Sequence, residues 1–126
     1  MRGDVDATAS RQMDASSEGF RFAEGKWNLR IVAALLWKPM GFNQLSRALV
    51  GISQNTLANR LDSLEALGVI TRTVLSVTPP ATLYTVDRPG RELSDTLAGL
   101  ARWGERWLAS EGAEGGVLAP SRWNDG

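Results

Sequence analysis

The chain of 126 residues contains neither cysteine nor histidine. The absence of cysteine excludes disulfides, thiolate nucleophiles and cysteine-based metal or redox centres. The absence of histidine removes the commonest general base and metal ligand, and with them the Ser-His-Asp arrangement of hydrolases. No other constellation of catalytic side chains is present, so we expect no enzymatic activity, no metal site and no cofactor.

Long apolar runs are also absent. No stretch approaches the roughly 20 apolar residues that a membrane-spanning helix requires. The first residues mix Arg2, Asp4 and Asp6 with small polar side chains and lack the apolar core of a signal peptide. We therefore expect a cytoplasmic protein without a membrane partner.

The chain also has no net charge, because 14 basic residues balance 14 acidic ones. The distribution is uneven, however. Residues 26–91 hold eight basic and three acidic side chains, a net charge of +5, whereas residues 1–25 carry −2 and residues 92–126 carry −3. A basic middle between acidic ends is typical of a core that faces nucleic acid. The alternative is chance clustering on a solvated surface.

The length leaves room for one domain with a core large enough to fold alone. Residues 1–18 are rich in Ser, Asp and Ala and predict a flexible N-terminal tail. Residues 112–126 contain several glycines and predict a flexible C-terminal tail. The domain is therefore expected over residues 19–111.

Residues 51–68 carry the most informative pattern. Ser53 is a good N-cap, and Gly68 suits the left-handed position that ends a helix. Between them, four leucines are spaced to lie on one helical face: Leu57, Leu61, Leu64 and Leu67. The pattern predicts a helix over residues 53–67, preceded by a turn at residues 50–52.

The rest of this region predicts further helices. A short opening helix is expected around Phe20 and Phe22, and another over residues 27–37, which ends at Lys38-Pro39 because proline disfavours helix in the preceding residue. A short helix is expected over residues 42–49. Asp87 can cap a last helix, whose expected buried stripe is Leu93, Leu97, Leu100 and Trp107, flanked by Trp103 and Leu108.

Two segments rich in β-branched residues, 69–77 and 82–86, predict a hairpin. Pro79-Pro80 cannot donate backbone hydrogen bonds and is expected in the loop between them. Five helices and one hairpin in this order predict an α+β, mainly α, fold. It is a winged helix-turn-helix with a two-stranded wing and extra N- and C-terminal dimerisation helices.

The outward side chains near the start of residues 53–67 suit base edges and phosphates, because most are uncharged polar groups. The predicted major-groove set is Ser53, Gln54, Asn55, Thr56, Asn59 and Arg60. The set predicted to hold phosphates or reach the minor groove is Asn43, Gln44, Arg47, Arg72, Ser76 and Thr78. Asp62 and Glu65 lack an accompanying base or metal ligand, so we expect a solvated helix face there rather than a catalytic pair.

The tryptophans divide into two groups. Trp27 and Trp37 are expected to pack in the core. Trp103 and Trp107 lie one turn apart on the last helix, where a winged domain buries little, so they predict a partner surface; an intramolecular core is the alternative. The full set predicted as a dimer interface or a pocket for a small apolar effector is Phe20, Phe22, Trp37, Leu100, Trp103 and Trp107. The alternative for this set is core and interface alone, without a ligand.

These residues resemble those of the HxlR-type (MarR-like) winged-helix transcriptional regulators of bacteria and archaea. The resemblance covers residues 20–110. It rests on Gly25-Lys26-Trp27, the segment from Phe42 to Leu49, Gly51-Ile52-Ser53-Gln54, Leu57, Arg60-Leu61, Leu64-Glu65, Gly68, Pro79-Pro80, Tyr84, Gly90-Arg91, Leu93 and Trp103-Gly104.

The resemblance implies a homodimer whose first and last helices form the interface, with two recognition helices in major grooves. Several members sense electrophiles, quinones or oxidants through a cysteine upstream of the Lys-Trp pair. The corresponding position in this chain is Asp14, and the chain has no cysteine elsewhere. The thiol switch is therefore not expected here.

The sequence thus predicts a homodimeric, sequence-specific regulator of transcription that binds double-stranded DNA at a pseudo-palindromic operator. The alternative is a winged-helix module for protein–protein interaction that has lost DNA binding. The net charge of zero and the small number of lysines favour this alternative.

Overall fold

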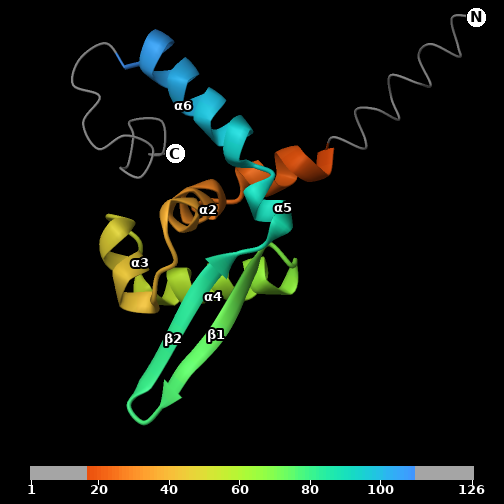
Figure 1. Cartoon of the computed structure of the whole chain (residues 1–126). Coiled ribbons are helices and arrows are strands. Elements are labelled where there is room, and N and C mark those ends of the chain that lie inside the picture. The colour runs from red at the N-terminus through yellow and green to blue at the C-terminus, as the bar shows by residue number, and fades with distance from the viewer. Residues whose placement is uncertain (1–16, 110–126) are drawn as a thin grey trace, which may run out of the picture.

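The computed structural model describes residues 17–109 and has the predicted mainly helical α+β architecture (Figure 1). Its helical body carries a hairpin at one end and a long helix at the other (Figure 1). The elements are a helix over residues 17–24, α2 (Asn28–Trp37), α3 (Phe42–Ala48), α4 (Gln54–Ala66), β1 (Ile70–Val77), β2 (Pro80–Val86), α5 (Arg88–Arg91) and α6 (Ser94–Trp107). No helix within residues 17–109 is long and apolar enough to cross a membrane.

Residues 17–24 are helical, so the predicted N-terminal tail overlaps this helix at residues 17 and 18. The rest of that tail and the predicted C-terminal tail lie outside the described residues. The next helix, α2, begins one residue later than predicted because Trp27 adopts a left-handed backbone conformation with φ of 78°.

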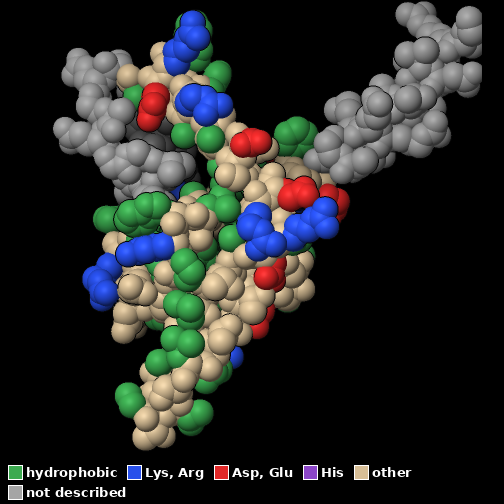
Figure 2. All heavy atoms as spheres, viewed as in Figure 1, with side chains coloured by type: hydrophobic (Ala, Val, Ile, Leu, Met, Phe, Trp, Pro, Cys, Tyr) green, Lys and Arg blue, Asp and Glu red, His purple; other side chains and the backbone are tan. Residues whose placement is uncertain are grey.

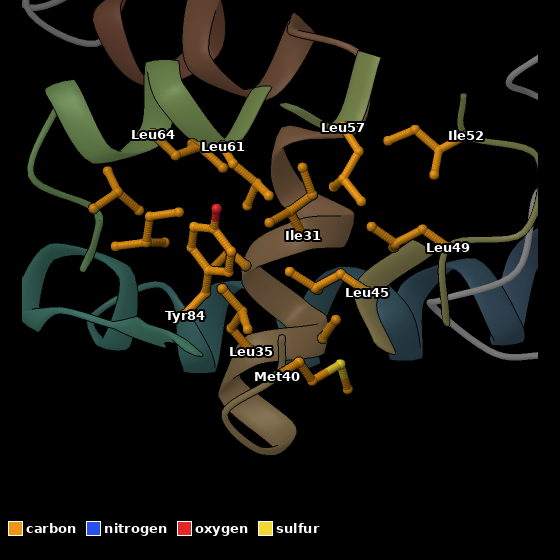
Figure 3. Packing of buried hydrophobic residues seen from close by; sticks show 14 of the residues in the cluster. Ile31, Leu35, Met40, Leu45, Leu49, Ile52, Leu57, Leu61, Leu64 and Tyr84 are labelled. Atoms are coloured by element: carbon orange, nitrogen blue, oxygen red, sulfur yellow. The ribbon is translucent and has the colours of Figure 1, made fainter. Parts of the chain in front are cut away.

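The core forms around α2, which lies between α3, α4 and the hairpin. Figure 3 shows side chains of α3, α4 and β2 pointing towards Ile31 and Leu35 of α2. The fully buried positions include Leu45 of α3, Leu49 just after α3, and three leucines of α4: Leu57, Leu61 and Leu64. The predicted leucine face of α4 is therefore confirmed at these positions.

Helix α4 begins and ends as its local signals predict. The Ser53 hydroxyl accepts a hydrogen bond from the Thr56 backbone N–H at 3.0 Å, and Gly68 has φ of +77°. The prediction for Leu67 is wrong, because its side chain is 64% exposed. The helix ends at Ala66, and the chain turns away from the core before the leucine stripe can extend further.

The hairpin is longer than predicted on its second strand. Pro80 starts β2 and pairs with Val77, so only Thr78 and Pro79 form the turn. A proline is tolerated there because the first residue of an edge strand need not donate to the ladder. The hairpin is anchored to the body by backbone hydrogen bonds between Met40 and Tyr84, with N···O distances of 3.2 and 2.8 Å.

The predicted last helix is split into α5 and α6. Asp87 precedes α5, but its carboxylate accepts a hydrogen bond from the Thr71 hydroxyl at 2.6 Å and makes no side-chain cap. Gly90 of α5 lies against the hairpin, where a Cβ would clash with Val86 and lie 3.0 Å from the Val69 carbonyl oxygen. This close approach requires glycine and holds α5 against the end of the wing.

The predicted buried stripe of the last helix is only partly correct. Leu97 is buried, and Leu93 packs partly against the core. Leu100 and Trp107 are exposed, because α6 extends away from the helical body towards its C-terminal end (Figure 1). The apolar face of α6 therefore continues past the part that the core covers.

A buried leucine of α4 and the exposed leucine that follows the helix provide a stability test. Leu61 is 1% exposed and Leu67 is 64% exposed. We expect Leu61→Ala to lower the free energy of unfolding by about 2–5 kcal/mol, because it leaves a cavity in the core. Leu67→Ala should change it by less than about 0.5 kcal/mol. Chemical denaturation at one protein concentration measures both, and equal losses would contradict the assigned core.

Candidate nucleic-acid interface

The first half of α4 presents polar side chains on the side opposite its buried leucines. Gln54, Asn55 and Asn59 are exposed, and Thr56 and Arg60 are half-buried. Because a helix turns by about 100° per residue, burial of one leucine stripe necessarily directs these residues outward. Amide groups at such positions can both donate to and accept from base edges, which suits readout of a major groove.

Three residues of the predicted set also have structural roles. The Ser53 and Thr56 hydroxyls lie 2.8 Å apart, and this contact accompanies the cap described above. The Gln44 side-chain oxygen accepts a hydrogen bond from the Gly41 backbone N–H at 2.8 Å. These side chains therefore fix the starts of α4 and α3, and only part of their hydrogen-bonding capacity remains for a ligand.

Helix α3 and the turn after it set the orientation of α4. Asn43 and Arg47 are exposed on α3. The chain then turns through Gly51, whose φ of +96° is a conformation that glycine adopts without strain, and the Ile52 backbone N–H donates to the Leu49 carbonyl at 3.1 Å. Leu49 and Ile52 are buried on either side of this turn, so the angle between α3 and α4 is fixed by packing.

The hairpin follows α4 with almost no intervening chain. The Gly68 and Val69 backbone N–H groups donate to the Glu65 and Leu64 carbonyls, each at 3.0 Å, and β1 begins at the next residue. The predicted wing contacts lie along this strand and its turn. Arg72 and Thr78 are exposed, and Ser76 is half-buried. The structure thus places the predicted residues on three successive elements that pack around α2.

Three arginines in this region are available to bind phosphates. Within residues 17–109, the ion pairs found are Arg21–Glu18 and Arg88–Glu92, and neither involves Arg47, Arg60 or Arg72. Burial lowers the pKa of the Arg30 guanidinium of α2, but an arginine shifted in this way still carries its charge at neutral pH. No group of potential metal ligands comes together in the same part of the chain.

The sequence did not predict the hollow beside α3. This open hollow is lined by residues 41–44 at the start of α3 and by residues 80–82 at the start of β2. Asn43 and Gln44, both predicted to contact DNA, therefore lie beside Ala81 and Thr82. No local pattern could reveal this proximity, because it depends on the pairing of Met40 with Tyr84.

Most of the predicted dimer or ligand residues are exposed rather than part of the core. At least half of each side chain is exposed for Phe20, Trp37, Leu100, Trp103 and Trp107, whereas Phe22 packs partly against the core. Side chains this exposed cannot enclose an apolar ligand within one chain.

The expectation that Trp37 packs in the core is wrong, because it is 71% exposed. It is the last residue of α2 and lies about 200° around the helix from buried Leu35. The Lys38 ammonium lies 5.1 Å from the centre of its ring instead. Trp27, by contrast, packs partly against the core as expected.

Comparison with known proteins agrees with this geometry. The family model of the HxlR-like helix-turn-helix matches residues 22–112. The HTH-type transcriptional regulator sll1512 of Synechocystis sp. is 34% identical over 95 residues, which cover 75% of this chain and 70% of that protein.

Solved structures of related regulators show the same fold. The transcriptional regulator YtfH from Salmonella typhimurium is 33% identical with a TM-score of 0.65, over 74% of this chain and 83% of that one. The reduced form of the transcriptional regulator YodB from Bacillus subtilis is 27% identical with a TM-score of 0.65, over 75% and 93%. Diamide-treated YodB is also similar, with a TM-score of 0.60 at 28% identity, over 72% and 90%. The chain therefore belongs to the HxlR-like helix-turn-helix family of transcriptional regulators.

Proposed function

We propose that this protein binds double-stranded DNA in a sequence-specific manner as a homodimer. In this proposal, residues 53–67 enter the major groove and the wing, residues 69–86, lies on the backbone or in the minor groove. The observation that carries the proposal is the exposed row of amide side chains at the start of α4, held outward by a buried leucine stripe. The membership of the chain in a family of transcriptional regulators supports it.

The residue types suggest a division of roles. Gln54, Asn55 and Asn59 suit base edges, because an amide can bond to adenine through two atoms at once. Arg47, Arg60 and Arg72 suit phosphates, because they are charged and lack ion-pair partners within residues 17–109. The remaining members of the predicted set supply shorter polar contacts: Asn43, Gln44, Ser53, Thr56, Ser76 and Thr78.

A second candidate function is a protein–protein interaction module that has lost DNA binding. The net charge of zero favours it, since sequence-independent affinity for DNA comes mainly from positive charge. The two functions differ in their response to salt. Release of counterions makes DNA binding fall steeply as salt rises, and a protein partner would show a weaker dependence.

Substitution in α4 tests the proposed major-groove face. We expect Gln54→Ala to weaken binding to a selected duplex by about 1–3 kcal/mol and to relax preference at one base position. Arg60→Ala should weaken binding to all DNA sequences alike. It should also reduce the salt slope, the change of log affinity with log salt concentration, by about one unit. Fluorescence anisotropy over a salt series measures both effects. Leu67→Ala at the far end of α4 is the control, and unchanged binding in both variants would contradict the assigned face.

The homodimer is proposed from the surface that α6 leaves uncovered. Leu100, Trp103 and Trp107 follow Leu97 along α6 but are exposed in one chain. Burial of a large aromatic side chain against a partner makes a large favourable contribution to the free energy of association. Two copies meeting about a two-fold axis through this face would bind half-sites one or two turns of DNA apart, about 10–21 base pairs.

A charge placed in the apolar strip formed by Leu100, Trp103 and Trp107 should prevent dimerisation. We expect Trp103→Glu to be monomeric at micromolar concentration, because dimerisation would bury the carboxylate without a partner. Ala98→Glu adds the same charge to an exposed position of α6 outside the strip and should remain dimeric. Multi-angle light scattering gives the mass of each variant. A dimeric Trp103→Glu protein would place the interface elsewhere.

We also propose that the protein does not signal through thiol oxidation. The similar structures include reduced and diamide-treated YodB, but this chain has no cysteine to form a thiolate. Two modes of action are then left. The protein binds DNA constitutively, or it responds to a small apolar effector held between the aromatic side chains of two protomers. The side chains of Trp103 and Trp107 carry no polar group other than the indole N–H. They therefore suit an apolar aromatic compound as the effector.

Treatment with diamide provides the corresponding test. We expect it to leave DNA affinity unchanged at concentrations that keep the protein folded, because no residue can form a disulfide. Anisotropy before and after treatment measures the affinity, and circular dichroism reports the fold. Reversible loss of DNA binding on diamide treatment would contradict the absence of a redox switch.

A further inference from the structure

The projecting part of the wing has no charge. Residues 73–86, from the middle of β1 to the end of β2, contain no Lys, Arg, Asp or Glu. Three apolar side chains of β1 are more than half exposed there: Val74, Leu75 and Val77. In Figure 2 the projecting hairpin is covered by apolar and neutral polar atoms, whereas charged side chains gather over the rest of the molecule. Such a tip cannot hold phosphates by charge.

A β-bulge adds a second unusual feature at the same place. Val74 pairs with Thr82 and Ser76 pairs with Ala81, which leaves Leu75 without a partner in β2. A bulge turns the local side chain away from its regular direction and is often found beside functional sites. The unpaired residue here is a leucine that remains 61% exposed. Together with Val74 and Val77 it gives three exposed apolar side chains on one short strand, and exposed groups of this kind mark binding sites.

The position of the wing favours DNA as that partner. The hairpin follows directly from the end of α4 and is hydrogen-bonded through Tyr84 to Met40, in the segment just before α3. These connections fix the wing beside the proposed major-groove helix. It also projects from the end of the molecule opposite α6, so a dimer formed through α6 leaves it uncovered (Figure 1).

We propose that the wing enters the minor groove as an apolar wedge, with Leu75 as the inserting side chain. This inference rests on the proposed DNA-binding function. Arg72 near the base of β1 would contact phosphate, and the uncharged tip would meet sugars and base edges on the groove floor. Apolar wedges inserted at the minor groove partly unstack a base step and bend the duplex towards the major groove. Recognition at this position then depends on how easily the DNA deforms.

The test uses the full-length protein and duplexes of about 40 base pairs enriched from a random pool by the unaltered protein, a length that holds two half-sites. We expect Leu75→Ala to weaken binding about tenfold, because one leucine loses its buried contact. It should also reduce the bend measured by energy transfer between dyes at the duplex ends. The salt slope should not change, because no phosphate contact is lost. Arg72→Ala should instead reduce that slope by about one unit.

Two further variants make the result specific. Leu67→Ala removes an equally exposed leucine outside the wing and should match the unaltered protein in affinity and bend. Leu75→Met retains an apolar side chain and should restore both properties. Circular dichroism and light scattering establish that each variant is folded and has the same oligomeric state.

The outcomes separate this inference from the proposed function. If the unaltered protein enriches no duplex, DNA binding itself is wrong, and the wedge is wrong with it. If it binds and bends DNA but Leu75→Ala does so equally well, only the wedge is overturned. A Leu75→Ala protein that binds DNA normally but changes its mass in light scattering would assign the wing to protein contact instead.

Discussion

The interaction on which the rest of the structure depends is the packing of the α4 leucines against α2. Leu57, Leu61 and Leu64 are each fully buried beside Ile31. Burial of one such side chain contributes about 1.5–3 kcal/mol, whereas a helix cap such as Ser53 contributes about 1 kcal/mol. The leucines therefore determine how α4 is rotated, and the cap determines only where it starts. The outward direction of Gln54, Asn55 and Asn59 is a consequence of that rotation.

The proposed DNA interface that results carries little charge. Its unpaired cations are concentrated in three arginines, and its wing tip is apolar. In such an arrangement, affinity must come largely from contacts that depend on base identity and DNA shape, since the counterion term grows with the number of phosphates neutralised. A low background of non-specific binding would favour selection of the operator among many competing sites.

The similarity to YodB shows how far a shared fold constrains function. The two chains share a fold over most of their length, but a fold does not supply a sensor unless the reacting group is present. The thiol is absent here, and the aromatic side chains of α6 are the feature that could take its place. The same surface would then serve dimerisation and regulation, because any ligand held there would alter the relation between the two recognition helices.

Several features could be predicted from the sequence because their causes are local. The start and end of α4 follow from Ser53 and Gly68, and the strands follow from segments rich in β-branched residues. The predictions that were wrong concern burial at the ends of elements. Leu67 and Leu100 continue apolar patterns, but each lies where its helix leaves the core. Trp37 lies on the side of α2 that faces away from Leu35. Periodicity identifies a face of a helix and does not say how far the covering partner extends.

Only the tertiary structure decided which distant residues meet. The pairing of Met40 with Tyr84 brings the start of α3 beside the wing, and the contact of Gly90 with Val86 and Val69 fixes α5 against the hairpin. The bulge at Leu75 likewise depends on the register of two strands. The sequence by itself determined the order, type and polarity of the elements, because hydrogen bonds and side-chain spacing along one segment specify these. Their mutual placement required the whole core, because it depends on packing among residues far apart in the chain.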